Sequence, residues 1–149
     1  MGEELKVTDA LVRLTHLVDH VFADVCREAD LTPQQAQLLC MLIDGPVGMT
    51  ELSRLLHLEK SSLTGLVDRV QRRGLVDRVR DGNDRRACRI ELTEAGERIG
   101  QESHRAMGER LDALLHDFDG RDRDRLTSSV SRILAAHTAA TGRPWDRTE

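Results

Sequence analysis

The sequence predicts a mainly α-helical fold with one small antiparallel β-hairpin. Apolar residues recur at helical spacing through most of the 149 residues, as they do in amphipathic helices that share a core. Two short runs, Leu75–Arg80 and Ala87–Thr93, are strand-like, and apolar and polar residues alternate in the second. The residues between them, 81–84, have the composition of a turn. A chain of this length fits a single domain, which we expect to span 1–149.

The first two helices are predicted on either side of a stop signal at residues 30–33. An apolar stripe from Leu11 to Val25 marks the first helix. Thr32 is suited to be the N-cap of the second helix and Pro33 to be its first residue. This second helix is strongly apolar, and Gly45-Pro46 ends it. Both helices should therefore contribute to the core.

Two shorter helices come next, Met49–Leu56 and about Lys60–Arg73, with a turn at 57–59 between them. Gly74 ends the second of the two. A helix, a tight turn, a second helix and a hairpin follow one another in a winged helix-turn-helix, whose second helix reads DNA. We therefore expect 31–93 to form a winged helix-turn-helix unit that binds double-stranded DNA.

The second helix of this pair has two distinct faces. Its apolar residues fall at positions i, i+3, i+4 and i+7 and should face the core: Leu63, Leu66, Val67 and Val70. Small residues on the opposite face allow a close approach to a major groove, and arginine suits a guanine edge or a phosphate. The predicted DNA-binding residues of this helix are Ser61, Ser62, Thr64, Gly65, Asp68, Arg69 and Arg72.

The tip of the hairpin is the second predicted DNA contact, through Asp84, Arg85 and Arg86. An arginine on a thin loop can enter a minor groove, and a neighbouring carboxylate can hold its guanidinium in place. Residues 51–90 contain ten Lys and Arg but six Asp and Glu, although the whole chain has a net charge of −4. Exposed charges more than roughly 8–10 Å apart are largely screened, so the local surplus of positive charge decides what this segment binds.

The runs 63–70 (LTGLVDRV), 73–76 (RGLV) and 92–96 (LTEAG), together with Asp81-x-x-Asp84-Arg85-Arg86, resemble the MarR family of winged-helix regulators. The resemblance covers essentially the whole chain. It implies that Arg86 enters the minor groove, that Asp84 supports it and that Arg85 is partly structural. It also implies that Ser61, Ser62, Thr64 and Arg69 lie at the major groove or its phosphates. Two positions depart from the family pattern, because Glu59 replaces a frequent Ser cap and His57 a frequent Gly.

A homodimer is expected because the flanking helices have apolar stripes that one copy cannot cover. The predicted helix from Thr93 to Phe118 would be roughly 39 Å long at about 1.5 Å per residue. This length exceeds the diameter of the DNA-binding unit. The last helix has a stripe of its own: Leu126, Val130, Ile133 and Leu134. We assign 1–30 and 94–141 to dimerisation, which would present two reading helices to a pseudo-palindromic operator. A long helix folded back on its own subunit is the alternative.

A small-molecule ligand is an open possibility. The resemblance implies a cleft formed by the first, second and fifth helices, where small molecules release DNA from many family members. No motif marks the residues of an effector pocket in this chain. The choice between repressor and activator is also open, although a dimer that blocks a promoter usually represses.

Other function classes find less support. We expect no enzyme and no cofactor, because the chain has no nucleophile elbow, no phosphate-binding glycine loop and no metal motif. A winged helix that binds a protein partner is one alternative. No apolar run could span a membrane and no signal-peptide pattern begins the chain, so we expect a cytoplasmic protein.

Two sensing variants of the same regulator are further alternatives. His16 and His20 are four residues apart on the first helix, but a zinc site needs three or four ligands, so no metal is expected. Cys26 could sense oxidants if Arg27 lowered the pKa of its thiol.

Overall fold

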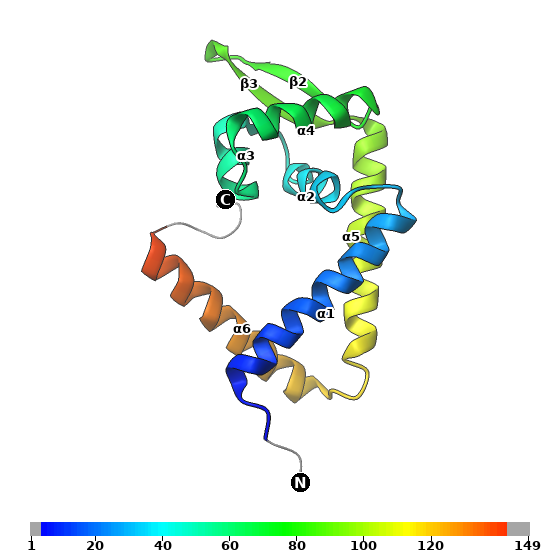
Figure 1. Cartoon of the computed structure of the whole chain (residues 1–149), viewed down its shortest axis with the longest axis vertical. Coiled ribbons are helices and arrows are strands. Elements are labelled where there is room, and N and C mark those ends of the chain that lie inside the picture. The colour runs from blue at the N-terminus through cyan, green and yellow to red at the C-terminus, as the bar shows by residue number, and fades with distance from the viewer. Residues whose placement is uncertain (1–3, 143–149) are drawn as a thin grey trace.

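The computed structural model describes residues 4–142, apart from the side chains of 81 and 84–86, and confirms the mainly α-helical fold with a hairpin (Figure 1). The elements in chain order are α1 (Val7–Glu28), α2 (Pro33–Leu42), β1 (Val47–Gly48), α3 (Met49–Leu56), α4 (Lys60–Arg72), β2 (Val76–Asp81), β3 (Asp84–Leu92), α5 (Glu94–Leu114) and α6 (Gly120–Thr141). The strands form one antiparallel sheet in the order β1-β3-β2.

Three of the predicted helix ends are confirmed by a hydrogen bond or a backbone angle. The Thr32 hydroxyl accepts from the backbone N–H of Gln35 at 3.2 Å, and the Gln35 side chain accepts from the backbone N–H of Thr32 at 3.1 Å. This reciprocal pair is a capping box, and Pro33 is the first residue of α2. Thr93 caps α5, and Gly74 has a φ of +73° beyond α4. Local sequence signals therefore set these three boundaries.

The sheet differs from the prediction in two ways. The strand β1 was not predicted, because two residues are too few for an alternation signal; Val47 pairs with Ile90 of β3. The strands β2 and β3 also extend through residues 81 and 84, which were assigned to the turn. Asp81 pairs with Asp84, so only residues 82 and 83 connect the strands. The composition of 81–84 favours a turn, but backbone pairing continues through its outer two residues.

The helix α5 ends earlier than predicted, at Leu114 instead of Phe118. The guanidinium of Arg123, in the first turn of α6, donates to the carbonyl oxygens of Leu115 at 2.9 Å and Phe118 at 3.3 Å. It also pairs with Asp112. These bonds satisfy carbonyl groups that would otherwise need a continued helix or water. A side chain from the next helix thus stabilises the end of α5.

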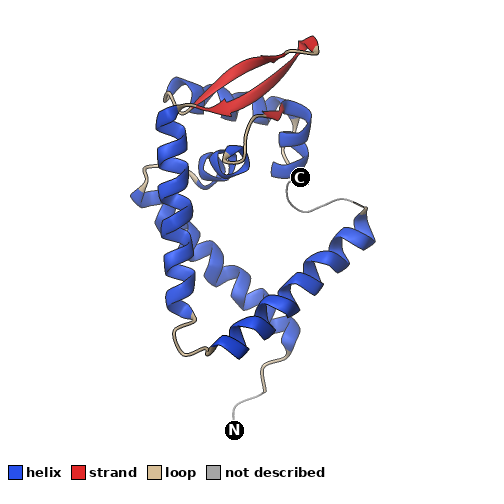
Figure 2. Cartoon of the chain, turned by 180° about the vertical axis from the view of Figure 1, so that it is seen from behind, coloured by secondary structure: helices blue, strands red, loops and turns tan. Residues whose placement is uncertain are grey.

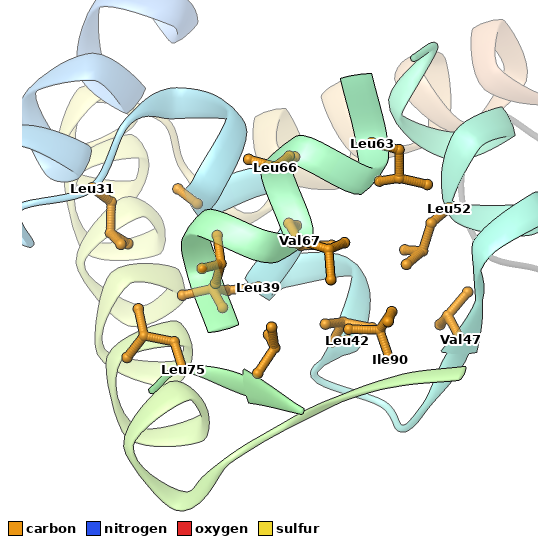
Figure 3. Packing of buried hydrophobic residues seen from close by; sticks show 14 of the residues in the cluster. Leu31, Leu39, Leu42, Val47, Leu52, Leu63, Leu66, Val67, Leu75 and Ile90 are labelled. Carbon is orange, nitrogen blue, oxygen red and sulfur yellow. The ribbon is translucent and has the colours of Figure 1, made fainter. Parts of the chain in front are cut away.

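The core lies inside the predicted DNA-binding unit, with α2 at its centre (Figure 3). The inward face predicted for α4 is confirmed, since each of its members is at most 1% exposed: Leu63, Leu66, Val67 and Val70. They pack with Leu38, Leu39 and Leu42 of α2 and with buried residues of the sheet. Burial of the apolar face leaves the opposite face of α4 outward.

The helices α1, α5 and α6 extend from this unit at the end opposite the hairpin (Figures 1 and 2). Among the described residues of α6, none is buried. Large apolar side chains are exposed on all three helices: Val7, Leu11, Val12, Leu14, Leu17, Leu114, Leu126, Val130 and Ile133. None of the helices within 4–142 has a stretch apolar enough to cross a lipid bilayer.

Candidate nucleic-acid interface

The outward face of α4 brings together all seven residues predicted for it. Five are exposed: Ser61, Ser62, Thr64, Arg69 and Arg72. Gly65 and Asp68 are half-buried beside them. They share one face because the opposite face is fixed in the core by four large aliphatic side chains. The face therefore presents hydroxyl groups in the first turns of the helix and guanidinium groups in the last turns.

Gly65 provides space for the side chain of Arg69 along the surface of the helix. A Cβ atom added to Gly65 would lie 3.3 Å from Nη1 of Arg69, so the guanidinium lies over the glycine. No hydrogen bond or ion pair joins this guanidinium to any part of the chain that the structure describes. The five N–H donors of Arg69 are therefore available to an external acceptor.

Asp68, in contrast, is already paired. Its Oδ1 accepts a hydrogen bond at 2.5 Å from Nη2 of Arg78 on β2, and the other terminal nitrogen of Arg78 donates to the side-chain oxygen of Gln71. Arg72 Nε donates to the backbone carbonyl of Asp68 at 3.3 Å. Arg78 was not among the predicted site residues. The alternation of side chains along a strand could have indicated its position. Arg78 lies two residues after the buried Val76, so both side chains are on the face of β2 that is turned toward α4.

The hairpin projects beyond α4, as both views show (Figures 1 and 2). The side chains of Asp84, Arg85 and Arg86 lie outside the described residues, whereas the backbone of all three belongs to β3. A hollow of about 680 Å³ separates the hairpin from the first residues of α3 and α4, with Thr50, Lys60 and Arg89 in its lining. The hairpin is thus separated by an open hollow from the first residues of α3 and α4.

One polar contact joins the end of α4 to the segment after α1, and another joins α1 to α5. Arg73, directly after α4, donates to the backbone carbonyl of Asp30 at 2.7 Å and to the side chain of Gln35 at 3.0 Å. Arg110 of α5 donates to the carboxylate of Glu28 in α1 at 2.5 Å. This hydrogen bond from Arg110 lowers the pKa of the Glu28 carboxyl. The end of α4 is therefore linked to the turn between α1 and α2 and to the start of α2, and α1 is linked to α5.

A smaller hollow, of about 310 Å³, lies between α1 and α5. Its lining is Val25, Glu28, Ala29, Ile99, Glu102, Ser103, Arg105 and Ala106. Among the described side chains, the Ser103 hydroxyl is the one buried polar group without a hydrogen-bond partner. The hollow therefore combines an apolar wall with charged groups and an unsatisfied hydroxyl.

The geometry gives little support to a metal site at His16 and His20 or to a redox sensor at Cys26. His20 Nε2 lies 3.8 Å from a carboxylate oxygen of Asp24, but no group of three metal-binding side chains occurs within the described part of the chain. Burial is the main cause that raises the pKa of Cys26, and burial also raises that of Cys40. These two thiols remain protonated at neutral pH, whereas a reactive sensor needs a thiolate.

Comparisons with known proteins agree with this architecture. The model of the MarR family matches residues 29–87. The transcriptional regulator FarR of Neisseria gonorrhoeae is 30% identical over 115 residues, which cover 76% of this chain and 78% of FarR. A MarR family protein from Bacillus stearothermophilus superimposes with a TM-score of 0.83 at 28% identity, over 89% of this chain and 93% of that one.

NadR in complex with 4-hydroxyphenylacetate shares the fold, with a TM-score of 0.70 at 23% identity over 89% of this chain and 95% of NadR. The matched region includes the motifs around α4 and the hairpin, and the structural match extends over the long helices as well. The chain belongs to the MarR family of winged-helix transcriptional regulators.

Proposed function

We propose that this chain is a cytoplasmic repressor that binds a pseudo-palindromic DNA operator as a homodimer. The observation that carries the proposal is the outward face of α4, where Arg69 and Arg72 lie exposed beside a projecting hairpin. In this arrangement α4 enters the major groove, and the hairpin reaches the adjacent minor groove. A dimer that occupies a promoter would exclude the polymerase.

The proposed DNA contacts divide into three groups. Ser61, Ser62 and Thr64 lie in the first turns of α4, where backbone N–H groups and the helix dipole favour phosphate. Gly65 allows close approach, while Arg69 and Arg72 bind guanine edges or phosphates. At the hairpin, Arg86 enters the minor groove with Asp84 as its support, and Arg85 is partly structural.

The homodimer is supported by the uncovered apolar surface of α1, α5 and α6. Leu126, Val130 and Ile133 of α6 are 37–49% exposed and recur along one side of the helix. An isolated helix is marginal in water, and α6 buries none of its described residues within the chain. A second copy would cover these surfaces and relate the two α4 helices by a two-fold axis.

Charged substitutions on α6 test the dimer. Val130→Asp combined with Ile133→Asp should convert a dimer to a monomer in analytical ultracentrifugation. Ser128→Asp is the matched control, because residue 128 lies on the opposite side of α6 from this stripe at 3.6 residues per turn. A monomeric wild type, or an unaffected double variant, would argue against this interface.

Duplex binding at increasing salt tests the DNA-binding role. The wild type should bind duplexes selected from a random library, and its affinity should fall steeply between 50 and 200 mM salt because several phosphates release counterions. The alternative is a winged helix that binds a protein partner. Failure to bind any duplex at low salt would favour that alternative.

A small-molecule effector is the second part of the proposal, and the hollow between α1 and α5 supports it. The unsatisfied Ser103 hydroxyl could bond to a polar ligand group there. Small carboxylic acids, including the 4-hydroxyphenylacetate found in NadR, are reasonable probes. Release of DNA by one of them, weakened in Ser103→Ala, would support this site. If no probe releases the DNA, the effector part of the proposal fails and the DNA-binding part stands.

A further inference from the structure

Arg78 lies at the point where β2 leaves the surface of α4. Val76, two residues earlier on the same face of the strand, is fully buried in the core. Arg78 pairs across the sheet with the buried Ile90, and beyond it the hairpin projects from the unit (Figure 1). Its side chain is 31% exposed, so it lies partly covered between the strand and the helix.

Both terminal nitrogens of Arg78 are used within the chain. One donates to the carboxylate of Asp68 at 2.5 Å and the other to the side-chain amide oxygen of Gln71. Two hydrogen bonds from one planar guanidinium to two residues of one helix fix its orientation better than a single contact does. The bond network therefore sets how the hairpin lies relative to α4.

The carboxylate of Asp68 needs a partner for an electrostatic reason. Asp68 lies on the face of α4 that we propose meets DNA, beside Arg69 and Arg72. An uncompensated negative charge there would repel phosphate groups, and the pairing with Arg78 neutralises it. Exposed or half-exposed ion pairs contribute little to folding stability. We therefore expect the pair of Asp68 and Arg78 to affect mainly the affinity for DNA.

We propose that Arg78 is a positioning residue for DNA recognition and does not itself contact DNA. It holds the hairpin against α4 so that both fit adjacent grooves, and it neutralises Asp68 on the DNA-facing surface. The proposal rests on the DNA-binding function proposed above. It separates the arginines of this surface by role, because Arg69 is free to meet an external acceptor, whereas Arg78 is engaged within the chain.

A double-mutant cycle on a selected duplex tests this role. Arg78→Gln should weaken binding about tenfold, because it leaves Asp68 uncompensated and the hairpin unbraced. Asp68→Asn should weaken binding less, since it loses the ion pair but keeps the bond between Arg78 and Gln71 and leaves no uncompensated negative charge. The double variant should recover part of the affinity lost in Arg78→Gln, because Asp68→Asn removes the uncompensated charge while the bond to Gln71 stays lost. Arg132→Gln on α6 removes the same charge far from the hairpin and serves as the control (Figure 1).

The thermal unfolding midpoint of each variant is measured in parallel. If Arg78 had a purely structural role, Arg78→Gln would have a lower midpoint, and adding Asp68→Asn would not restore its DNA binding. If Arg78→Gln binds equally weakly with Asp or Asn at 68 and its unfolding midpoint is unchanged, Arg78 contacts DNA directly and the proposal is wrong. Wild-type affinity in Arg78→Gln would overturn it as well. Should the wild type bind no duplex, the DNA-binding function fails and this assignment fails with it.

Discussion

Gly96, at the start of α5, packs directly against the backbone carbonyl of Leu75, where the chain enters the hairpin. A Cβ atom on Gly96 would lie 1.9 Å from that carbonyl oxygen. The same carbonyl accepts a hydrogen bond from the backbone N–H of Thr93, and the Thr93 hydroxyl donates to the carbonyl of Gly74 at 2.6 Å. This junction fastens the long helix α5 to the base of the hairpin.

Gly96→Ala should therefore destabilise the fold by about 2–3 kcal/mol, because a backbone carbonyl cannot give way as a flexible side chain can. Chemical denaturation measures the change. The matched control is Gly108→Ala on the same helix, where a Cβ would meet nothing within 4 Å. That change should be neutral or stabilising by up to about 1 kcal/mol. Equal effects of the two substitutions would contradict the close packing of Gly96.

Arg69→Ala should cost on the order of 1–3 kcal/mol of DNA affinity without loss of folding stability. The guanidinium is exposed and makes no bond within the described part of the chain, so its removal disturbs little in the fold. Fluorescence anisotropy on several related duplexes measures both affinity and preference. A relaxed preference would identify a base contact, whereas a uniform loss would identify a phosphate contact. Unchanged affinity would remove Arg69 from the interface.

Cys26 and Cys40 should react slowly with iodoacetamide in the native protein at pH 7.5. Burial raises the pKa of both thiols, and only the thiolate is a nucleophile. Mass spectrometry of tryptic peptides, before and after denaturation, measures the labelling. Both cysteines should be labelled after unfolding. Rapid native labelling of Cys26, with release of DNA by peroxide, would instead support the redox-sensing variant.

The bond between Glu28 and Arg110 gives a pH dependence of defined sign. Because the pKa of Glu28 is lowered in the folded state, its stabilising contribution is present above the unfolded pKa. That contribution is lost as the pH falls through the lower folded value. Because this pair is exposed, the expected effect is small: Glu28→Gln should unfold at a slightly lower temperature than the wild type at pH 7, and this difference in unfolding temperature should narrow below about pH 4. A difference that grows on acidification would contradict the assignment.

Short-range signals account for the parts of the fold that were predicted correctly. Thr32, Thr93 and Gly74 act through bonds or backbone angles within a few residues, so their roles are visible in the local sequence. The inward face of α4 follows from spacing alone. His57 has a φ of +52°, in the left-handed region that favours Gly, so this turn takes the geometry without a glycine.

Longer-range contacts account for what the sequence did not reveal. The strand β1 exists because β3 offers it a partner 43 residues away, between Val47 and Ile90. The pairing of Asp68 with Arg78 joins a helix to a strand, and no local pattern predicts which charges meet across such a junction. The end of α5 depends on Arg123 from the following helix. The two faces of a helix can be predicted from one sequence, whereas the ion-pair partner of a charged side chain can be identified only from the three-dimensional fold.

Footprinting of a selected operator, together with the number of chains bound per duplex, tests most directly whether two α4 helices and two hairpins engage DNA symmetrically. We expect two chains per duplex and two related protected segments whose centres lie about one helical turn, roughly 34–36 Å, apart. Arg86→Ala should remove the minor-groove protection at the outer edge of each segment and leave the major-groove protection in place. One chain per duplex, or a single protected segment, would contradict the account.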